Sequence, residues 1–514
     1  MIARESIRVS LAVFAATASG ITHAGALRDE IESTARQNFP EYLALLRHRN
    51  IPDVPEDMAR NADYLEDLFE QRSFRTQRIE NAAGRPAVIA ELTGQTGDAP
   101  TVMFYMHYDG QPVSPAQWSQ RDPFEPVVKR QASSGDWVEV AADALQAEPL
   151  DSELRVFARA ASDDKAPIMM FLTAVDLLQA TGESPAFNIR VLLDGEEEIG
   201  SPSLAAMVAS QPEAFTADAL VVLDGPSHAS GRSTLVFGNR GITRVTLTVF
   251  GAKSPLHSGH YGNYAPNPAQ RLAALIATFK DDDGRVLVPG FYAGVELSDA
   301  DRTMLAAVDD DENALLRRIG IARPESVGSN YQEALQYPSL NIRGLAAAGV
   351  GAQAANVIPS EAIAEIDMRT TPATDGRRLF DLLRQHIELQ GYQLVEGLPK
   401  DEDRVEHDKL ARLELISVQA AMRTPIDSPV GDWAREALRS AAAPTPGEDP
   451  VLIRMMGGTV PTDVLVGALQ VPFVLVPTVN ADNNQHAHDE NLRIGNFVSG
   501  TEIIYALLTT SYAR

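Results

Sequence analysis

The sequence predicts an α/β protein: a doubly wound, mostly parallel sheet interrupted by an inserted α+β domain. Apolar strand-like runs and helical segments alternate from residue 26 to about residue 239, as they do in a doubly wound sheet. The same alternation resumes near Thr424, after an interval with a different pattern. One domain split by an insertion is therefore the simplest layout.

The elements of the first domain follow from local signals. Helices are expected over residues 26–49, 58–71 and 167–180, the last with Gly182 just beyond its end. Ser201 and Pro202 begin a further helix, as N-cap and first-turn residue. Strands are expected in five apolar runs, at 100–106, 154–161, 188–193, 219–223 and 471–477. The segment 133–152 breaks the alternation and is expected to be a loop excursion.

The inserted domain is expected at residues 241–405, after a junction at 238–241. Residues 243–250 alternate as a strand, and Asn267 with Gln270 three positions later opens a helix. A strand at 362–369, a helix at 375–390 and a strand at 392–396 complete the unit. The first domain would then comprise residues 25–240 and 406–514.

Composition restricts the classes of function. A chain of 514 residues is too long for one hydrophobic core, so several domains are expected. Lys and Arg number 44 against 70 Asp and Glu, and the net charge of −26 repels phosphate backbones, which disfavours nucleic acid as a partner. The chain contains no cysteine, so any metal must be held by His, Asp or Glu.

Residues 1–24 resemble a signal peptide. Arg4 and Arg8 lie in a short basic start, residues 9–18 are apolar and small, and Thr22-His23-Ala24 offers a small-x-small cleavage pattern. The alternative is a short buried N-terminal helix. No other stretch approaches the ~18 apolar residues that span a bilayer. We therefore expect an exported protein, periplasmic or secreted, with no membrane partner.

Five acidic or histidine clusters follow the five expected strands. They are His-Tyr-Asp at 107–109, Ser-Asp-Asp-Lys at 162–165, three Glu at 196–198, Asp224, and His-Ala-His-Asp-Glu at 486–490. Open α/β sheets place their chemistry beyond the carboxyl ends of the strands. Two cations that share a carboxylate need this supply of nitrogen and oxygen donors. The pattern predicts a dinuclear metal site in a hydrolase.

The first two clusters also have ordinary structural explanations. His107 and Asp109 lie on one face of a strand, which suits a histidine ligand supported by a carboxylate but also a buried core histidine. Asp163 and Asp164 precede a helix, where acidic residues complement the helix dipole. One of the two could instead bridge two metals, and spacing alone does not choose between these explanations.

The remaining clusters leave similar alternatives. Among residues 196–198 one glutamate can bind a metal while its neighbour takes a proton from water, but a solvated acidic turn has the same sequence. Asp224 ends an apolar run, where an ionised group needs a partner or a metal. Either His486 or His488 could reach a metal. Only the five clusters together favour a metal site over these structural explanations.

These residues resemble the dinuclear zinc metallopeptidases that include carnosine dipeptidase, aminoacylase and glutamate carboxypeptidase, and above all the dipeptidase branch. The resemblance covers most of the chain after residue 24. It is carried by residues 106–112 (Met-His-Tyr-Asp-Gly-Gln-Pro), 161–165 (Ala-Ser-Asp-Asp-Lys), 195–201 (Gly-Glu-Glu-Glu-Ile-Gly-Ser), 256–259 (Leu-His-Ser-Gly), 289–292 (Pro-Gly-Phe-Tyr), 356–359 (Asn-Val-Ile-Pro) and 457–461 (Gly-Gly-Thr-Val-Pro).

The resemblance implies a role for each clustered residue. Asp163 bridges both metals, and each metal then takes two further ligands, His107 with Asp224 for one and Glu198 with His486 for the other. His486 is favoured over His488 because Asp and Glu follow it at the family's spacing, at 489 and 490. The catalytic residues implied are Glu197, the general base, and Asp109, which supports His107.

The inserted domain carries the implied substrate-binding residues, with one further position in the C-terminal part of the chain. His257 resembles a histidine that reaches the active site of the partner subunit. Asn356, Arg369 and Thr459 match positions that hold the substrate. The resemblance thus implies a homodimer formed through the inserted domain. Ordinary surface polar groups are the alternative for all four residues.

The expected reaction is metal-dependent hydrolysis of peptide bonds in dipeptides or short peptides with a free amino terminus. A hydroxide bridging two divalent ions attacks the carbonyl, with Glu197 as base; zinc is the expected metal, and manganese or cobalt can replace it. Within the family, Asp at position 224 favours this over the alternatives, an N-acyl-amino-acid deacylase or a carboxypeptidase. A metal-poor binding protein on the same scaffold is disfavoured by the intact ligand set.

Overall fold

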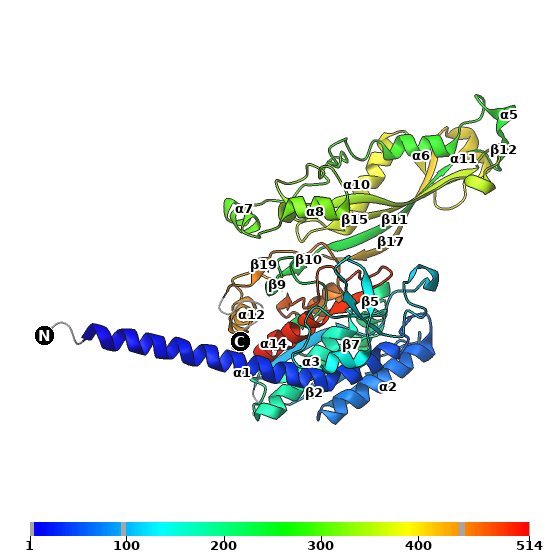
Figure 1. Cartoon of the computed structure of the whole chain (residues 1–514). Helices are drawn as coiled ribbons and strands as arrows, with labels where there is room; N and C mark the ends of the chain where they lie inside the picture. Colours follow the sequence, from blue (N-terminus) through cyan, green and yellow to red (C-terminus); the bar gives the residue numbers. More distant parts are fainter. Residues whose placement is uncertain (1–4, 94–98, 442–447, 513–514) are drawn as a thin grey trace. The chain divides into compact units, whose positions relative to one another are not determined.

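The computed structural model describes residues 5–93, 99–441 and 448–512, with the backbone alone over residues 5–25 (Figure 1). The chain forms two compact units. The first contains the residues up to Phe237, Thr424–Leu452 and the residues from Val464 onward, and the second contains Gly238–Arg423 and Ile453–Asp463. Both mix helices with sheets, so the predicted α/β class and the presence of an inserted α+β unit are confirmed.

An eight-stranded sheet organises the first unit. Its central strands, β7, β3, β8 and β20, are parallel, and antiparallel strands flank them. The order is β1 (Arg75–Ile79), β2 (Ala87–Leu92), β7 (Asn188–Asp194), β3 (Thr101–His107), β8 (Ala219–Val222), β20 (Phe473–Leu475), β9 (Thr234–Val236) and β19 (Val451–Ile453). Residues on both faces of β3 and β8 are buried, as expected of strands covered on two sides.

Five helices contribute side chains to the core around this sheet: α1 (Glu5–Arg47), α2 (Pro55–Gln71), α3 (Lys165–Thr181), α12 (Pro429–Ser440) and α14 (Ile494–Thr509). The shorter helices are α4 (Leu204–Ser210) and α13 (Thr462–Leu469). Helix α3 contacts α1 and α14, and nearly all of its residues from Lys165 to Leu178 are buried, which is typical of a helix enclosed by protein. Rings join these layers: Phe39 packs against Phe497 at 5.1 Å, and Phe104 against Phe171 at 5.2 Å.

The first unit also contains a second, antiparallel sheet, and this sheet differs from two of the expectations from the sequence. Its order is β21 (Asn491–Arg493), β6 (Arg155–Phe157), β4 (Val127–Gln131) and β5 (Trp137–Glu139). The run at 154–161 therefore supplies a short strand of this sheet, not a strand of the main sheet. The segment 133–152 is partly ordered, since Trp137 packs on Phe157 at 5.2 Å and under the Arg155 guanidinium at 4.9 Å. Three-residue strands are too short to give a periodic signal.

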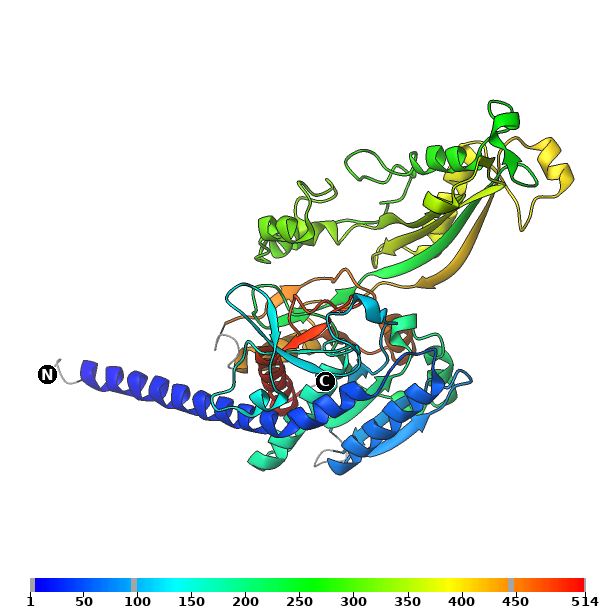
Figure 2. The ribbon, with the colours of Figure 1, turned by 45° about the vertical axis from the view of Figure 1, so that its right-hand side comes forward.

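The second unit is built on a five-stranded sheet (Figure 2). The order is β13 (Ser339–Ala346), β15 (Glu361–Thr370), β11 (Gly241–Phe250), β17 (Leu410–Gln419) and β16 (Gln393–Leu394). Helices α6 (Pro268–Ile276) and α10 (Gly376–Leu389) contact this sheet, and Leu272, Leu379 and Leu383 belong to the same buried cluster as its inward side chains. Alternate residues of β15 are buried, the pattern of a sheet with one covered face.

Shorter elements complete the second unit. They are β10 (Gly238–Asn239), β12 (Leu256–His257), α5 (Ser258–Tyr261), α7 (Asp299–Ala306), α8 (Glu312–Ile319), α9 (Tyr331–Ala334), β14 (Val357–Ile358), α11 (Asp401–Glu406) and β18 (Met422–Arg423). The unit extends beyond the expected boundary at residue 405 because β17 pairs with β11 along its whole length, from Phe250–Leu410 to Ile242–Gln419. Residues 453–463 also return to it.

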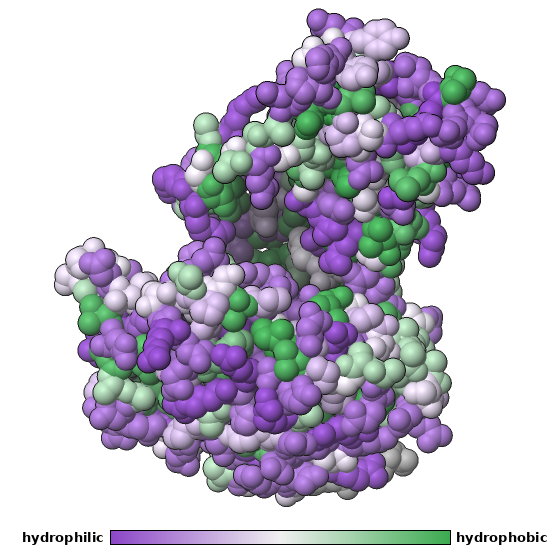
Figure 3. Space-filling model, turned by 90° about the vertical axis from the view of Figure 1, so that its right-hand side faces the viewer, coloured by the Kyte–Doolittle hydropathy of each residue, from purple (hydrophilic) through white to green (hydrophobic). Residues whose placement is uncertain are grey.

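The N-terminal segment is described only in part. Residues 1–4 of the expected signal peptide lie outside the described residues, as do the side chains of its remainder, whose backbone forms the first part of α1. Among the described residues, no helix is both long enough and apolar enough to cross a membrane. Figure 3 shows one face of the molecule, on which hydrophilic residues predominate and hydrophobic ones form small separate patches.

Candidate metal centre

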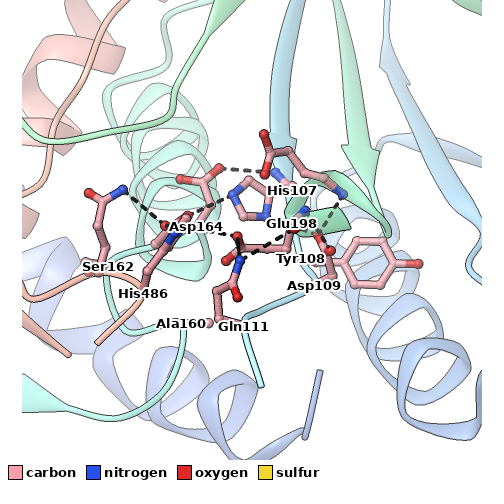
Figure 4. Close-up of polar contacts among 12 residues, drawn as sticks. His107, Tyr108, Asp109, Gln111, Ala160, Ser162, Asp164, Glu198 and His486 are labelled. Carbon is pink, nitrogen blue, oxygen red and sulfur yellow. Dashed lines mark hydrogen bonds and ion pairs between the residues drawn. The ribbon is translucent and has the colours of Figure 1, made fainter. Parts of the chain in front are cut away.

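The parallel strands of the first unit deliver most of the clustered residues to one edge of the sheet. Strand β3 ends at His107, β7 ends three residues before Glu197, and β8 ends two residues before Asp224. Because parallel strands end at the same edge, side chains that follow them meet there. Figure 4 shows His107, Glu198 and His486 in one close group, with Asp109 beside it.

Asp163 lies between the two histidines. Its Oδ1 lies 2.9 Å from Nε2 of His107, and its Oδ2 lies 3.1 Å from Nε2 of His486. His486 Nε2 also lies 3.1 Å from Oε2 of Glu198. His486 adopts φ of +62°, a left-handed conformation that histidine tolerates better than most residues and that aims its ring at the two carboxylates.

The potential ligands form two groups that share Asp163. One is His107, Asp163 and Asp224, the other Asp163, Glu198 and His486, and within each group the donor atoms lie within 4.8 Å of one another. Zinc binds imidazole nitrogen and carboxylate oxygen at about 2.0–2.2 Å, so ligand atoms around one ion are at most about 4.4 Å apart. The two groups are therefore close to the size that two ions bridged by one carboxylate require.

The structure also separates the alternatives that spacing left open. Asp164 belongs to neither group among the described residues, and its Oδ2 accepts a hydrogen bond from the backbone N–H of His107 at 3.1 Å. His486 and His488 are both exposed, but only His486 is in one of the two groups among the described residues. All five residues expected to bind metal are brought together.

Asp109 connects the first histidine to the glutamate turn. It is fully buried, and its Oδ1 lies 3.2 Å from Nδ1 of His107, on the side of the ring opposite Asp163. The same carboxylate accepts hydrogen bonds from the backbone N–H groups of Glu197 and Glu198, at 3.1 and 3.0 Å. One side chain thus fixes the orientation of a ligand histidine and of two glutamates.

The electrostatics of this group fit bound cations. Five carboxylates surround two imidazoles: Asp163, Asp224 and Glu198 belong to the ligand groups, and Asp109 and Glu197 lie next to them. Burial, followed by repulsion from Asp163, raises the pKa of Asp224 to about 7, and burial raises the pKa of Asp109 to about 6. Hydrogen bonding to Asp163 and then to Glu198 raises the pKa of His486 to about 11. Clustered carboxylates of this kind are stabilised by cations, and oxygen and imidazole donors without thiolate suit zinc, manganese or cobalt.

Glu197 lies beside the ligands without being one of them among the described residues. It begins the short 3-10 turn Glu197–Ile199, directly before the ligand Glu198. Burial, together with repulsion from Asp224 and Glu198, raises the pKa of its carboxyl group well above the usual value. A carboxylate with a raised proton affinity next to a metal pair is suited to accept a proton from water.

Glu490 is a functional candidate that sequence reasoning used only to align His486. It is fully buried, and its carboxylate accepts hydrogen bonds from the backbone N–H groups of Ala160, Ser162 and Asp163 at 2.9, 2.9 and 3.0 Å. The Ser162 hydroxyl donates to it at 2.9 Å, and Nη1 of Arg159 donates at 2.7 Å. Glu490 therefore holds the loop that presents Asp163. Its position in the His-x-x-Asp-Glu cluster was the available signal.

We expect Glu490→Gln to weaken metal binding about 10- to 100-fold, the usual cost of losing support behind a ligand. The amide would turn an N–H group toward buried N–H donors of the Asp163 loop, and each unsatisfied donor costs about 1–3 kcal/mol. Competition with a chromophoric chelator measures the affinity. Asp489→Asn is the matched control, because Asp489 is the neighbouring carboxylate and its Oδ1 accepts from the backbone N–H of Ser119 (2.9 Å), outside the Asp163 loop. Equal affinities in both variants would contradict the role of Glu490.

The four expected substrate residues form two separate pairs in the second unit. Arg369, near the end of β15, donates from Nη1 to Oγ1 of Thr459 at 2.8 Å. His257 ends β12, and the carbonyl of Asn356 accepts from the next residue's backbone N–H at 2.9 Å. Asn356 precedes the first residue of β15 by five positions, so the length of that strand, roughly 25 Å, separates the two pairs.

Comparison with known proteins gives this geometry a family. The model of peptidase family M20/M25/M40 matches residues 103–510. The Cys-Gly metallodipeptidase dug1 of Schizosaccharomyces pombe is 26% identical over 421 residues, 80% of each chain, and the Beta-Ala-His dipeptidase of Mus musculus is 25% identical over 430 residues, 82% of this chain and 79% of its own.

A solved structure of the same family is also similar to this chain. The M20 family metallo-carboxypeptidase Sso-CP2 from Sulfolobus solfataricus superposes with a TM-score of 0.75 and 26% identity, covering 92% of this chain and 99% of its own. The family match spans the strand that ends at His107, the Asp163 loop, the glutamate turn and the loop of His486. With its ligand groups assembled and the match extending over most of its length, the chain belongs to peptidase family M20/M25/M40 and is a metal-dependent peptide hydrolase.

Proposed function

We propose that the chain hydrolyses the peptide bond of dipeptides and short peptides with a free amino terminus. The reaction would use two divalent cations, and zinc is the metal that we expect. The observation that carries this is the pair of ligand groups sharing Asp163, with Glu197 beside them. The names of the relatives supply the substrate class, since the fission yeast and mouse proteins are dipeptidases.

The residues then have distinct roles. His107 and Asp224 would hold one cation, Glu198 and His486 the other, and Asp163 both. When bound, such cations lower the pKa of a bound water and polarise a carbonyl oxygen. Glu197 accepts the proton of the attacking water and passes it to the departing amine nitrogen. Arg369, with Thr459 beside it, offers a guanidinium to the substrate's carboxylate.

A panel of matched dipeptides tests the substrate class. We expect free dipeptides to be cleaved with a kcat/KM at least tenfold above that of their N-acetylated forms. Faster cleavage of the N-acetylated forms would favour an N-acyl-amino-acid deacylase or a carboxypeptidase. The likeness to the Sulfolobus metallo-carboxypeptidase gives that second candidate its support. Longer N-acetylated peptides separate the two, because only a carboxypeptidase releases their last residue.

We also propose a homodimer formed through the second unit. The separation of His257 and Asn356 from Arg369 along β15 supports it, since one unit cannot bring both pairs to one substrate. The exposed His257 hairpin would instead reach the metal centre of a partner, in a twofold arrangement of the commonest kind.

We further propose that the protein is exported to the periplasm or the medium. The apolar residues 9–18 and the small-x-small pattern at 22–24 support this proposal, which N-terminal sequencing of the mature protein tests.

Mixing two inactive variants tests the action of His257 in the partner subunit. His257→Ala and Glu197→Gln chains should each be nearly inactive alone. After subunit exchange about a quarter of the wild-type activity should return, because half of the dimers are mixed and each has one complete site. Mixed dimers confirmed by tagged purification that show no activity would mean that His257 does not act across the dimer.

A further inference from the structure

A cavity of about 630 Å³ lies within the second unit, apart from the metal centre. Its lining includes residues of α8, which Figure 1 labels, of α9, of the segment between them, of the first part of β13 and of the loop at 280–292. None of its lining residues is a proposed metal ligand or substrate-binding residue. Cavities of roughly 300–1,000 Å³ are the usual size for small organic ligands.

Arg240, from the junction at 238–241, is the cationic group enclosed in the lining. It is only 7% exposed. Its Nη2 donates to the carbonyl of Tyr337 at 2.7 Å and to Oγ of Ser339 at 3.1 Å, while its Nε has no hydrogen-bond partner. Within the described part of the chain, no carboxylate forms an ion pair with it.

A buried arginine without an ion-paired carboxylate is costly for the folded protein, because its charge is removed from water. Asp367 attracts the Arg240 guanidinium without forming an ion pair, but less strongly than Arg369 repels it. Burial first, and the nearby Arg369 second, lower the pKa of Arg240 to about 10, which still leaves the guanidinium charged at neutral pH. Such an arrangement is typical of a site that an anion completes. The N–H of Nε offers a charge-assisted hydrogen bond to an oxyanion.

The rest of the lining selects the kind of anion. Val286, Leu316 and Leu335 contribute apolar surface, and Ile319 and Ile321 lie at the exposed rim. The charged lining residues comprise three cations, Arg240, Lys280 and Arg318, against two carboxylates, Glu312 and Glu325. This local excess of positive charge contrasts with the net charge of −26 of the whole chain. The combination suits an apolar molecule with one carboxylate better than a free inorganic anion.

We propose that this cavity binds an organic monocarboxylate whose apolar body lies against Leu316 and Leu335 and whose carboxylate contacts Arg240. The site is additional to the metal centre and does not depend on the proposed peptidase function. The two can therefore fail separately, since one is measured by binding and the other by hydrolysis.

Isothermal titration calorimetry of the metal-loaded protein with 4-phenylbutyrate tests the proposal, with 4-phenylbutanamide as the uncharged isostere. We expect the carboxylate to bind at least tenfold more tightly than the amide. Arg240→Met should weaken the binding of the carboxylate at least tenfold and leave that of the amide nearly unchanged. Equal affinity of both probes, absence of binding at millimolar concentration, or full retention of carboxylate binding in Arg240→Met would overturn the proposal.

A rim variant decides the question if Arg240→Met does not fold. Ile319 is 53% exposed, so Ile319→Glu leaves the core intact and brings a negative charge to the mouth of the cavity. We expect it to weaken carboxylate binding several-fold. Val405→Glu, at a residue 87% exposed and outside the cavity, is the matched control and should bind as the unsubstituted protein does. Equal affinity of the two glutamate variants would contradict the assignment.

Discussion

Glu197→Gln should lower kcat by about 10²- to 10⁴-fold, the usual contribution of a general base, while leaving the metal content unchanged. The amide has nearly the shape of the carboxylate but cannot accept the proton of the attacking water. The ligand groups do not include Glu197, so the binding of cations should persist. Steady-state kinetics with a free dipeptide, combined with elemental analysis of the same sample, measures both quantities.

Glu196→Gln is the matched control for this variant. Glu196 is the preceding glutamate, but its carboxylate accepts hydrogen bonds from the backbone and hydroxyl groups of Ser203 and is in neither ligand group. Its substitution should leave kcat within a few-fold of the wild-type value. Wild-type turnover in Glu197→Gln, or an equal loss in the two variants, would exclude Glu197 as the specific base.

Asp163→Ala should remove both cations and abolish measurable hydrolysis, because this carboxylate belongs to both ligand groups. Asp224→Ala is the informative comparison, since Asp224 belongs to one group only. Elemental analysis should therefore give two ions per wild-type chain, one in the Asp224 variant and almost none in the Asp163 variant. If the Asp163 and Asp224 variants retain the same metal content, Asp163 does not bridge the ions.

The residues at the edge of the main sheet were predictable from the sequence, because each lies directly at or after the end of an apolar run that can be recognised by itself. His107 and Asp224 follow apolar strands of the central sheet, and the ends of such strands converge whatever the rest of the chain does. The place of Asp163 was not predictable in this way, because the strand before it belongs to the small antiparallel sheet. Its position depends on Glu490, 330 residues beyond Ala160, and no periodicity records a contact over that distance.

In the inserted unit, too, local features were predictable from the sequence and long-range contacts were not. Strand β15 was visible because alternate residues face one core over its ten residues. Strand β11 was visible because apolar and polar residues alternate in its sequence at 243–250, although most of its residues are buried. The boundary was placed early because β17 belongs to this sheet through its pairing with β11, which is a property of two segments and not of either alone. The Arg369–Thr459 contact likewise joins residues whose proximity only the fold determines.

The clamp between Glu490 and the Asp163 loop constrains when the metal centre can mature. The residues that build it extend from His107 to Glu490, so a nascent chain shorter than 490 residues has no support for Asp163 and no second histidine. During synthesis the carboxylates of the earlier segments are present without the groups that organise them. The complete pair of ligand groups therefore forms only in the nearly finished polypeptide, and the cell compartment in which folding ends determines which metal is available to it.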